Sequence, residues 1–403
     1  MSTDLLPAAT ALAPRITALR RTIHAEPELG LHTPLTMAKV RGELADLPLE
    51  WRTGPSTTGA IAVLKGARPG PVVLLRGDMD ALPMTEPDGL PFASTVPGRM
   101  HACGHDAHTA MLAGAARLLA AHQAELAGEI RFMFQPGEEG HFGARHMIED
   151  GLLAPLPDAA FALHIMPDMP HGQVTCRPGT MMASADMLRI TVTGRGGHAS
   201  MPHQTRDPVP VAAEIIGAIQ ALVTRRFTAA EAMVITITQL SAGSAHNVIA
   251  DQAVLSGTIR TLSAERRTEV RGALARLADG IAAAHDCTAE VIVTDGFPPT
   301  VNDDRAAALV AEVAGALPGA DYVPMAHPLM GAEDFSYVLQ QVPGAMAFLG
   351  VAPTDSNDPA GRPGLHSVRM TLDEAALPRG TALLAAAALR FTERGWPETS
   401  QNT

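Results

Sequence analysis

The sequence predicts an α/β protein of two domains, in which a mixed, mostly parallel sheet flanked by helices is interrupted by a smaller α+β domain. Three observations predict this fold. The chain has 403 residues, which exceeds the usual size of a single domain. Short apolar runs alternate with helical patterns in the first half and again near the end. Between them, residues 185–295 show the order βαββαβ, which is typical of a small two-layer sandwich.

Four segments carry the alternation in the first half. Residues 71–75 form a continuous apolar run, typical of a strand that is buried on both faces. Residues 109–122 have helical spacing and abundant Ala, whereas 129–135 and 158–163 have the composition of strands. Strands that alternate with helices favour a largely parallel sheet.

The middle of the chain has a different pattern. Four strands and two helices are expected in the order strand 186–193, helix 208–223, strands 233–239 and 253–262, helix 264–285 and strand 288–294. We therefore expect an inserted domain over 185–295 and a discontinuous main domain over 1–184 plus 296–403.

After the insertion the first pattern resumes. Residues 304–317 are expected to form a helix and 345–351 a strand. Residues 373–390 are mainly helical, and Pro378 predicts a break or kink there.

Composition excludes several classes of function. The formal net charge of −12, with no dense basic cluster, argues against nucleic acid as a partner. The N-terminal residues lack the pattern of a signal peptide, and no apolar run is long enough to predict a membrane helix. The three cysteines are far apart and odd in number, so a disulfide framework is not expected and a cytoplasmic location fits.

Polar clusters follow the predicted strands of the first half. Residues 76–80 (RGDMD) follow one strand, 136–139 (PGEE) follow the next, and His164 follows the third. The run HACGHDAH at 101–108 lies between the first two clusters, immediately before a helix. Ligands gather at the carboxyl ends of strands in open α/β sheets, so these groups are expected at one edge.

Each cluster also has a simpler interpretation. Asp78 and Asp80 are common turn formers, the Glu138–Glu139 pair could be solvated, and a lone His164 is often structural. The HACGHDAH run is more specific, because three histidines and a cysteine within eight residues suit zinc, manganese or cobalt.

Several motifs together resemble the M20 metallopeptidase family, and most closely its amidohydrolase branch of hippurate hydrolases, auxin-conjugate hydrolases and N-acyl-L-amino acid amidohydrolases. They occur in the expected order over most of the chain. They are RRTIH (20–24), PELG (27–30), RGDMDALP (76–83), HACGHDAHTAM (101–111), FQPGEEG (134–140), GARHMI (143–148), ALHI (162–165), GRGGHASMPH (194–203), NVI (247–249), GTIR (257–260), MGAEDFS (330–336) and a late His366.

The resemblance implies a zinc-peptidase-like catalytic domain, an inserted lid domain that pairs subunits, and two divalent ions per chain. The ions would be Zn²⁺ or Mn²⁺, with Co²⁺ or Ni²⁺ as alternatives. The implied metal ligands are Cys103, His105, Glu139, His164 and His366. Glu138 stands where the general base belongs, and Asp78 and Asp80 would orient ligands without binding metal.

The same resemblance assigns substrate contacts to the lid. Arg260 is expected to bind the α-carboxylate of the substrate. Asn247 would add a hydrogen bond, and His198 would donate to the carbonyl oxygen as negative charge develops on it. A surface Arg, a turn Asn and a loop His are the alternatives. A homodimer is expected, with a higher homo-oligomer or a monomer as alternatives.

The sequence departs from the branch at a few positions. Gly137 replaces the more usual Ala, Ala332 replaces a Gly, and Val368 stands where Pro is common. The acidic residue usual after Gly30 is missing. None of these positions is an implied ligand, so they affect the expected substrate more than the expected chemistry.

The implied reaction is hydrolysis of the amide bond of an N-acyl amino acid. The nucleophile would be a metal-bound water, whose pKa a bound ion lowers from about 15.7 to about 7. Glu138 would take the proton of that water and return it to the leaving amine. Adjacent residues of an extended chain point in opposite directions, so Glu138 and Glu139 are expected to have different roles.

Three other functions are compatible with parts of the sequence. A dipeptidase or carboxypeptidase of the same superfamily is the main alternative, although the Cys103-Gly-His105 motif favours the amidohydrolase. A catalytically silent binding protein would usually have lost a ligand or the base, and all six positions are filled. A cysteine-nucleophile amidase would use Cys103 and His105 but would leave the glutamates and the remote histidines without a role.

Overall fold

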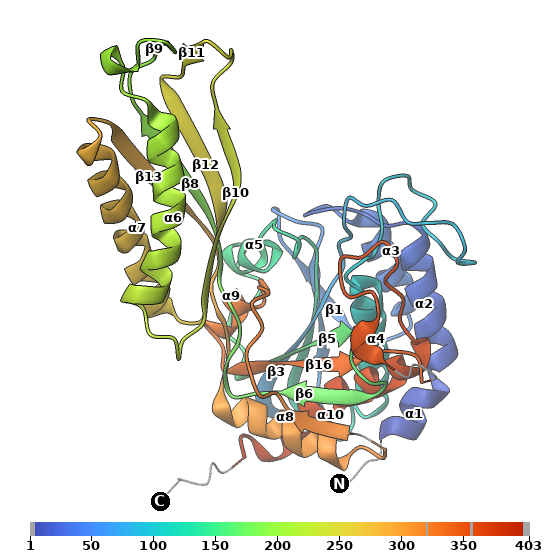
Figure 1. Cartoon of the computed structure of the whole chain (residues 1–403). Helices are drawn as coiled ribbons and strands as arrows, with labels where there is room; N and C mark the ends of the chain where they lie inside the picture. Colours follow the sequence, from blue (N-terminus) through green and yellow to red (C-terminus); the bar gives the residue numbers. More distant parts are fainter. Residues whose placement is uncertain (1–4, 320, 355–357, 398–403) are drawn as a thin grey trace, which may run out of the picture. The chain divides into compact units, whose positions relative to one another are not determined.

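The computed structural model describes residues 5–319, 321–354 and 358–397. It divides into two compact units (Figure 1). The first unit comprises Met1–Met181, Val301–His327 and Asp334–Thr403, and the second comprises Met182–Thr300 and Pro328–Glu333. The expected boundaries at 185 and 295 lie close to these, but Pro328–Glu333, which was expected in the main domain, groups with the second unit.

The first unit is built on an eight-stranded sheet with the order β1-β2-β4-β3-β5-β16-β6-β15. The four central strands, β4, β3, β5 and β16, are parallel to one another. Antiparallel pairs join β1 to β2, β2 to β4 and β16 to β6. The strands are β1 (Glu50–Thr53), β2 (Ala60–Lys65), β3 (Arg68–Asp78), β4 (Ala127–Gln135), β5 (Ala159–Met166), β6 (Gln173–Cys176), β15 (Asp321–Pro324) and β16 (Gly344–Gly350). The predicted mixed, mostly parallel sheet flanked by helices is confirmed.

The central strands are buried on both faces, as their continuous apolar sequences predict. Apolar side chains of helices α1, α2, α4, α8 and α10 share one core with them. The helices are α1 (Leu5–Ala11), α2 (Ala13–Ala25), α3 (Pro34–Glu43), α4 (His105–Ala121), α5 (Gly143–Glu149), α8 (Asp304–Ala316), α9 (Ser336–Leu339) and α10 (Leu377–Arg394), with the 3₁₀ turns η2 (Pro359–Gly361) and η3 (Glu374–Ala376).

Pro378 does not break the C-terminal helix. It stands in the first turn of α10, after the separate turn η3. A proline is tolerated there because the first amides of a helix have no intrahelical acceptor. The expected break is therefore the start of the helix.

The second unit is the predicted βαββαβ sandwich. Its sheet has the order β10-β12-β8-β13 and is antiparallel at each pairing. Helices α6 and α7 lie along one face of this sheet (Figure 1) and share a separate core with it. The elements are β8 (Ala185–Thr193), α6 (Pro208–Arg226), β10 (Met233–Ala242), β12 (Gln252–Thr261), α7 (Ala264–Ala284) and β13 (Thr288–Phe297), with β9 (Gly197–His198), β11 (Val248–Ile249) and η1 (Pro202–Gln204) in the connections.

Two short strands, β7 (Gly179–Met182) and β14 (Thr300–Asn302), pair where the chain passes between the units. Among the residues that the structure describes, no helix is long and apolar enough to cross a membrane.

Candidate metal centre

The predicted polar clusters meet at one edge of the first unit's sheet. β3 ends at Asp78, and the two glutamates follow β4 directly. Cys103 and His105 lie at the start of α4, which packs on β3. His164 lies inside β5 and not after it, because this strand continues to Met166. Since β3, β4 and β5 are parallel neighbours, their carboxyl ends fall together.

His105 directs Nε2 of its ring toward the other predicted ligands. The ring is fully buried, and its Nδ1 lies 2.8 Å from the carbonyl oxygen of Asp80. A carbonyl only accepts, so Nδ1 carries the proton. Within the described residues, the buried Nε2 has no hydrogen-bond partner. A histidine fixed in this way through its other nitrogen is typical of metal ligands.

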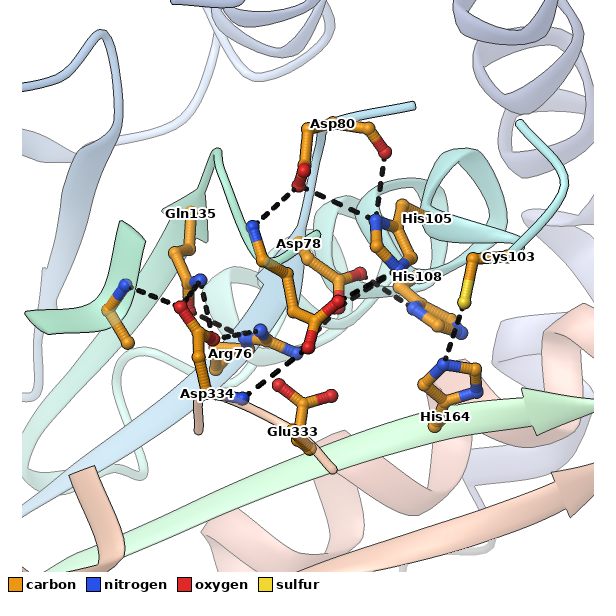
Figure 2. A network of polar contacts seen from close by, with 12 residues as sticks. Arg76, Asp78, Asp80, Cys103, His105, His108, Gln135, His164, Glu333 and Asp334 are labelled. Carbon is orange, nitrogen blue, oxygen red and sulfur yellow. Dashed lines mark hydrogen bonds and ion pairs between the residues drawn. The ribbon is translucent and has the colours of Figure 1, made fainter. Parts of the chain in front are cut away.

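The ring of His164 is also held through its Nδ1. Its Nδ1 donates to the carbonyl oxygen of Ile165 at 2.7 Å. Nε2 is therefore left with a lone pair, and it lies 3.4 Å from Cys103 Sγ (Figure 2).

Cys103 belongs to two groups of possible ligands. The ligand atoms of Cys103, His105 and His164 lie within 4.8 Å of one another, and so do those of Cys103, Glu139 and His366. A thiolate shared by both groups could bridge two ions. Cysteine, imidazole and carboxylate donors are a set that suits zinc and its neighbours in the first transition series. The five predicted ligands therefore fit two divalent cations.

Backbone geometry places Cys103 and His366. Gly104 has φ of +85°, and a Cβ there would lie 2.6 Å from the Ile165 side chain, so the turn between Cys103 and His105 requires glycine. His366 also has a positive φ, of 62°, and its amide donates to the Ala102 carbonyl at 2.8 Å. This bond ties His366 to the cysteine loop, with Nε2 3.1 Å from Glu139 Oε1.

The Asp80 carboxylate holds the glutamate turn and is not itself free to bind metal. Its two oxygens accept the amides of Glu138 and Glu139 at 2.9 and 3.0 Å. The backbone carbonyl of Asp80 also accepts from His105. Asp80 therefore orients both the predicted ligand His105 and the segment that contains the predicted base Glu138.

Asp78 acts through a histidine that the sequence analysis did not single out. Its Oδ1 lies 2.6 Å from His108 Nδ1, and its Oδ2 accepts from Arg76 Nη1 at 2.6 Å. Nε2 of His108 accepts from the amide of Ile165 at 2.9 Å. Both nitrogens of His108 are thus occupied, so it supports the strand beside His164 and is not a candidate ligand. The sequence contained one indication of this contact: His108 lies three residues after His105 and therefore on the same face of the helix.

The two glutamates have different surroundings, although the expected reason for a difference does not apply. Residues 138–140 form a turn, with φ of +74° at Gly137, and are not extended. The alternation of an extended chain therefore does not apply. Glu138 Oε2 lies 3.9 Å from His105 Nε2, whereas Glu139 approaches His366. The glycines that flank the pair could have predicted the turn.

The electrostatic surroundings differ from one predicted ligand to the next. Hydrogen bonds to Cys103 and Glu139 raise the pKa of His366 to about 10. Burial opposes the charged form of His105, but the Asp78 carboxylate outweighs it and raises that pKa well above its ordinary value. Burial raises the pKa of the Cys103 thiol. The carboxylates of Asp78 and Glu139 thus favour positive charge on the rings of His105 and His366, whereas burial lowers the pKa of His164 well below its ordinary value.

The three predicted substrate residues lie in the second unit. His198 in β9 pairs with Val248 in β11, and the amide of Ala199 donates to the carbonyl of Asn247 at 3.0 Å. His198 and Asn247 are therefore neighbours. Arg260 lies in β12, opposite Val234.

Comparisons with known proteins show the family of this chain. Residues 74–390 match peptidase family M20/M25/M40. The chain belongs to peptidase family M20. The predicted family is thus confirmed, and with it the class of metal-dependent amidohydrolase.

Three similar proteins span nearly the whole chain. An N-acetylcysteine deacetylase of Bacillus subtilis (strain 168) is 39% identical and covers 94% of this chain and 97% of its own. Thermostable carboxypeptidase 2 of Saccharolobus solfataricus is 38% identical and covers 94% of this chain and 96% of its own. The crystal structure of the Bacillus subtilis YXEP protein, described as a dinuclear metal-binding M20 peptidase, has a TM-score of 0.84 at 37% identity and covers 95% of this chain and 99% of its own.

Proposed function

We propose that this M20 protein hydrolyses the amide bond of N-acyl amino acids, such as hippurate-like or N-acetyl compounds, and releases a carboxylic acid and a free amino acid. The observation that carries the proposal is the pair of ligand groups that share Cys103, with the Glu138 carboxylate beside them.

The ligands in this proposal are Cys103 for both ions, His105 and His164 for one, and Glu139 and His366 for the other. Zn²⁺ or Mn²⁺ is proposed, with Co²⁺ or Ni²⁺ as alternatives. When bound, such ions lower the pKa of water and polarise the scissile carbonyl.

Glu138 is the proposed general base. Its backbone is held by Asp80, its side chain is largely buried, and Oε2 faces the His105 side of the site. A carboxylate held next to the ligands, but outside the two ligand groups that share Cys103, is placed to accept a proton from water and pass it to the leaving amine.

Arg260 is the proposed partner of the substrate's α-carboxylate. The structure gives it no hydrogen bond or ion pair within the described residues, and its position in β12 is partly buried. Burial lowers the pKa of the guanidinium, and Asp186 partly opposes this. A partly desolvated arginine without a carboxylate partner is suited to bind one bidentately.

His198 is the proposed donor to the carbonyl oxygen. The amide of Ser200 donates to His198 Nδ1 at 3.2 Å, and Ser200 Oγ lies 2.8 Å from the same atom. Nδ1 must therefore be the acceptor, and the proton of the neutral ring lies on the exposed Nε2. This tautomer supports the donor role, and the adjacent Asn247 is the proposed second polar contact.

A dipeptidase or carboxypeptidase activity is the alternative. The carboxypeptidase relative and the deacetylase relative are almost equally identical to this chain. A substrate with a free α-carboxylate fits either reaction. The two activities therefore differ in the group on the acyl side of the scissile amide, which is a simple acyl group in one case and an amino acid in the other.

The test is a hydrolysis panel after reconstitution with Zn²⁺, Mn²⁺ or Co²⁺. It should contain N-acetyl, N-benzoyl and longer N-acyl amino acids beside dipeptides of the same C-terminal residue, with Glu138→Gln as the control. We expect the N-acyl compounds to give the higher kcat/KM. Faster cleavage of the dipeptides would replace the proposal with the alternative.

A homodimer that forms through the second unit is also proposed. The edge strands β10 and β13 expose the apolar residues Val234, Leu240 and Ile292, and uncovered edges with apolar side chains favour association. Sedimentation at micromolar concentration should give twice the chain mass of 42.1 kDa. A monomer would contradict this part.

A cytoplasmic location is the last part of the proposal. The three cysteines are free and buried, which fits a reducing compartment. Fractionation of the producing cell should find the protein with cytoplasmic markers.

A further inference from the structure

Asp334 has a fully buried carboxylate and no assigned role. It begins the last segment of the first unit, directly after the stretch Pro328–Glu333 that groups with the second unit. Its Oδ1 accepts from Arg76 Nη2 at 2.9 Å and from Gln135 Nε2 at 2.8 Å (Figure 2). Its Oδ2 accepts from Gln135 Nε2 at 2.9 Å and from the amide of Ala144 at 2.9 Å.

These bonds join Asp334 to β3, β4 and the start of α5. Ligand atoms of Asp334, Glu138 and Glu333 lie within 4.8 Å of one another, but both Asp334 oxygens already accept from N–H donors, which makes Asp334 a poor metal ligand. Arg76 is itself buried and also pairs with Asp78. Its guanidinium donates to Asp78 and Asp334, and also to the side-chain oxygen of Gln135, so these partners restrict its position. The backbone at Asp334 is therefore held from three elements.

That backbone contacts the proposed general base. The amide of Asp334 donates to Glu138 Oε1 at 3.4 Å, at the long end for such a bond. The other oxygen, Oε2, faces His105 Nε2 at 3.9 Å. The two oxygens of Glu138 thus have different surroundings, one toward Asp334 and one toward the ligands.

We propose that Asp334 is a positioning residue for Glu138. Its side chain, fixed by Arg76, Gln135 and Ala144, presents a backbone N–H to Oε1 and so keeps Oε2 directed at the reacting water. This inference rests on the proposed function of Glu138 as the base. General base catalysis requires an oriented lone pair, and misplacement by about 1 Å can cost about 10²-fold in rate.

A purely structural role makes a different prediction. If the network only stabilised the fold, its loss would lower activity with or without the base. If Asp334 acts through Glu138, its loss has no further effect once the base is gone. A double-mutant cycle separates the two, because residues that act as one unit are not additive.

The kinetic experiment uses Asp334→Asn in the wild type and in Glu138→Gln, with metal content and KM measured for each. Asn keeps the size of the side chain but puts an amide where Ala144 or Arg76 donates. We expect kcat to fall between about 10- and 100-fold in the first background, with about two ions retained and KM changed by less than about twofold. We expect no further fall in the second background. An equal fall in both would overturn the proposal.

A milder substitution keeps the cycle usable if Asp334→Asn does not fold. Gln135→Met removes two hydrogen bonds to Asp334 and the one that Gln135 accepts from Arg76 Nε, but leaves the pairing of Asp334 with Arg76 Nη2. A loss of kcat of about 3- to 10-fold is expected, again only when Glu138 is present. A folded Gln135→Met protein with wild-type kcat would count against the proposal.

Hydrogen exchange tests the contact without any substrate. In metal-free protein, the peptide that contains residue 334 should exchange faster in Glu138→Ala than in the wild type, and Glu139→Ala is the matched control with no expected change. Equal exchange in all three would overturn the contact. A wild type that cleaves no panel substrate would refute the proposed function, while this exchange result would still decide the contact.

Discussion

The predicted catalytic residues and the predicted recognition residues are held in opposite ways. His105 and His164 are buried, and each has one ring nitrogen fixed by a backbone carbonyl. His198 and Asn247 are exposed in the connections of the second unit, and Arg260 has no polar partner among the described residues. The first set is buried and held by backbone contacts, whereas the side chains of the second set are exposed or partly buried.

The difference follows from what each group has to bind. Divalent ions require several donors at fixed distances, so their ligands depend on second contacts that hold each ring. A substrate that must enter and leave is better recognised by groups that change their contacts when it binds. Removal of a catalytic group should therefore abolish turnover, and removal of a recognition group should change selectivity.

Removal of the metal ions should have the largest effect. A strong chelator is expected to lower kcat by at least ~10³-fold, since bound ions supply several kcal/mol of stabilisation to the transition state. Added Zn²⁺, Mn²⁺ or Co²⁺ should restore the rate, and elemental analysis of the active protein should find about two ions per chain. Full activity in chelator without bound metal would contradict the predicted site and favour the Cys103 nucleophile.

The adjacent glutamates give the next largest effect. Glu138→Gln should keep both ions and the fold while kcat falls by at least ~10²-fold, the lower range for general acid–base catalysis. Glu139→Gln should instead lose about one ion per chain, because of the two ligand groups that share Cys103 only one contains Glu139. Metal analysis and kcat of the two variants check the division, and identical behaviour would show that it is wrong.

Local sequence indicates the first set more directly than the second, for a physical reason. Cys103 and His105 are close in sequence, and the strands that contain Asp78 and precede Glu138 are recognisable from apolar runs. The contacts of Asp334 with Arg76 and Gln135 span 258 and 199 positions, and no local pattern contains them. The motif at residues 330–336 contains Asp334, but only the fold brings Asp334 to these partners.

Local geometry limited the prediction elsewhere. The turn at the two glutamates replaced an expected extended segment, because Gly137 takes a positive φ. Strands β1, β2, β6 and β15 were not predicted, and three of them are only four residues long. Such short strands are specified by their neighbours in the sheet more than by their own periodicity.

Substitution of Arg260 tests the predicted recognition residues. Its expected effect on catalysis is smaller than that of the glutamates. Arg260→Ala should raise KM for a free-acid substrate by about 10- to 100-fold, since a hydrogen bond to a charged group contributes about 1.5–3 kcal/mol. The preference for the acid over its methyl ester should disappear. Arg260→Lys, the matched control, should keep part of the preference. If Arg260→Ala still prefers the acid by the wild-type factor, it does not bind the carboxylate.

A buried cluster next to the predicted ligand His105 gives the last prediction. Substitution there should have the smallest effect on activity but a measurable effect on stability. His24 lies 2.8 Å from Asp106 and 2.9 Å from Glu86, and Asp106 directly follows His105. Burial alone would lower the pKa of His24, but the Asp106 and Glu86 carboxylates outweigh it and raise the pKa to about 9. The protonated ring is thus favoured in the folded protein, and this pair helps to fix the first turn of α4.

The sign of the pH dependence follows from that shift. A group whose pKa is higher in the folded state contributes all of its stabilisation below its unfolded pKa of about 6.5 and loses it as pH rises through about 9. The contribution is of the order of 3 kcal/mol. We therefore compare the free energy of unfolding of metal-saturated wild type and His24→Gln between pH 6 and 10. The wild type should be more stable at pH 6, and the difference should shrink toward zero near pH 10. Other histidines that titrate in this range are common to both proteins and cancel in the difference. A gap that stays constant with pH would mean that His24 stabilises α4 by packing alone and not by its charge.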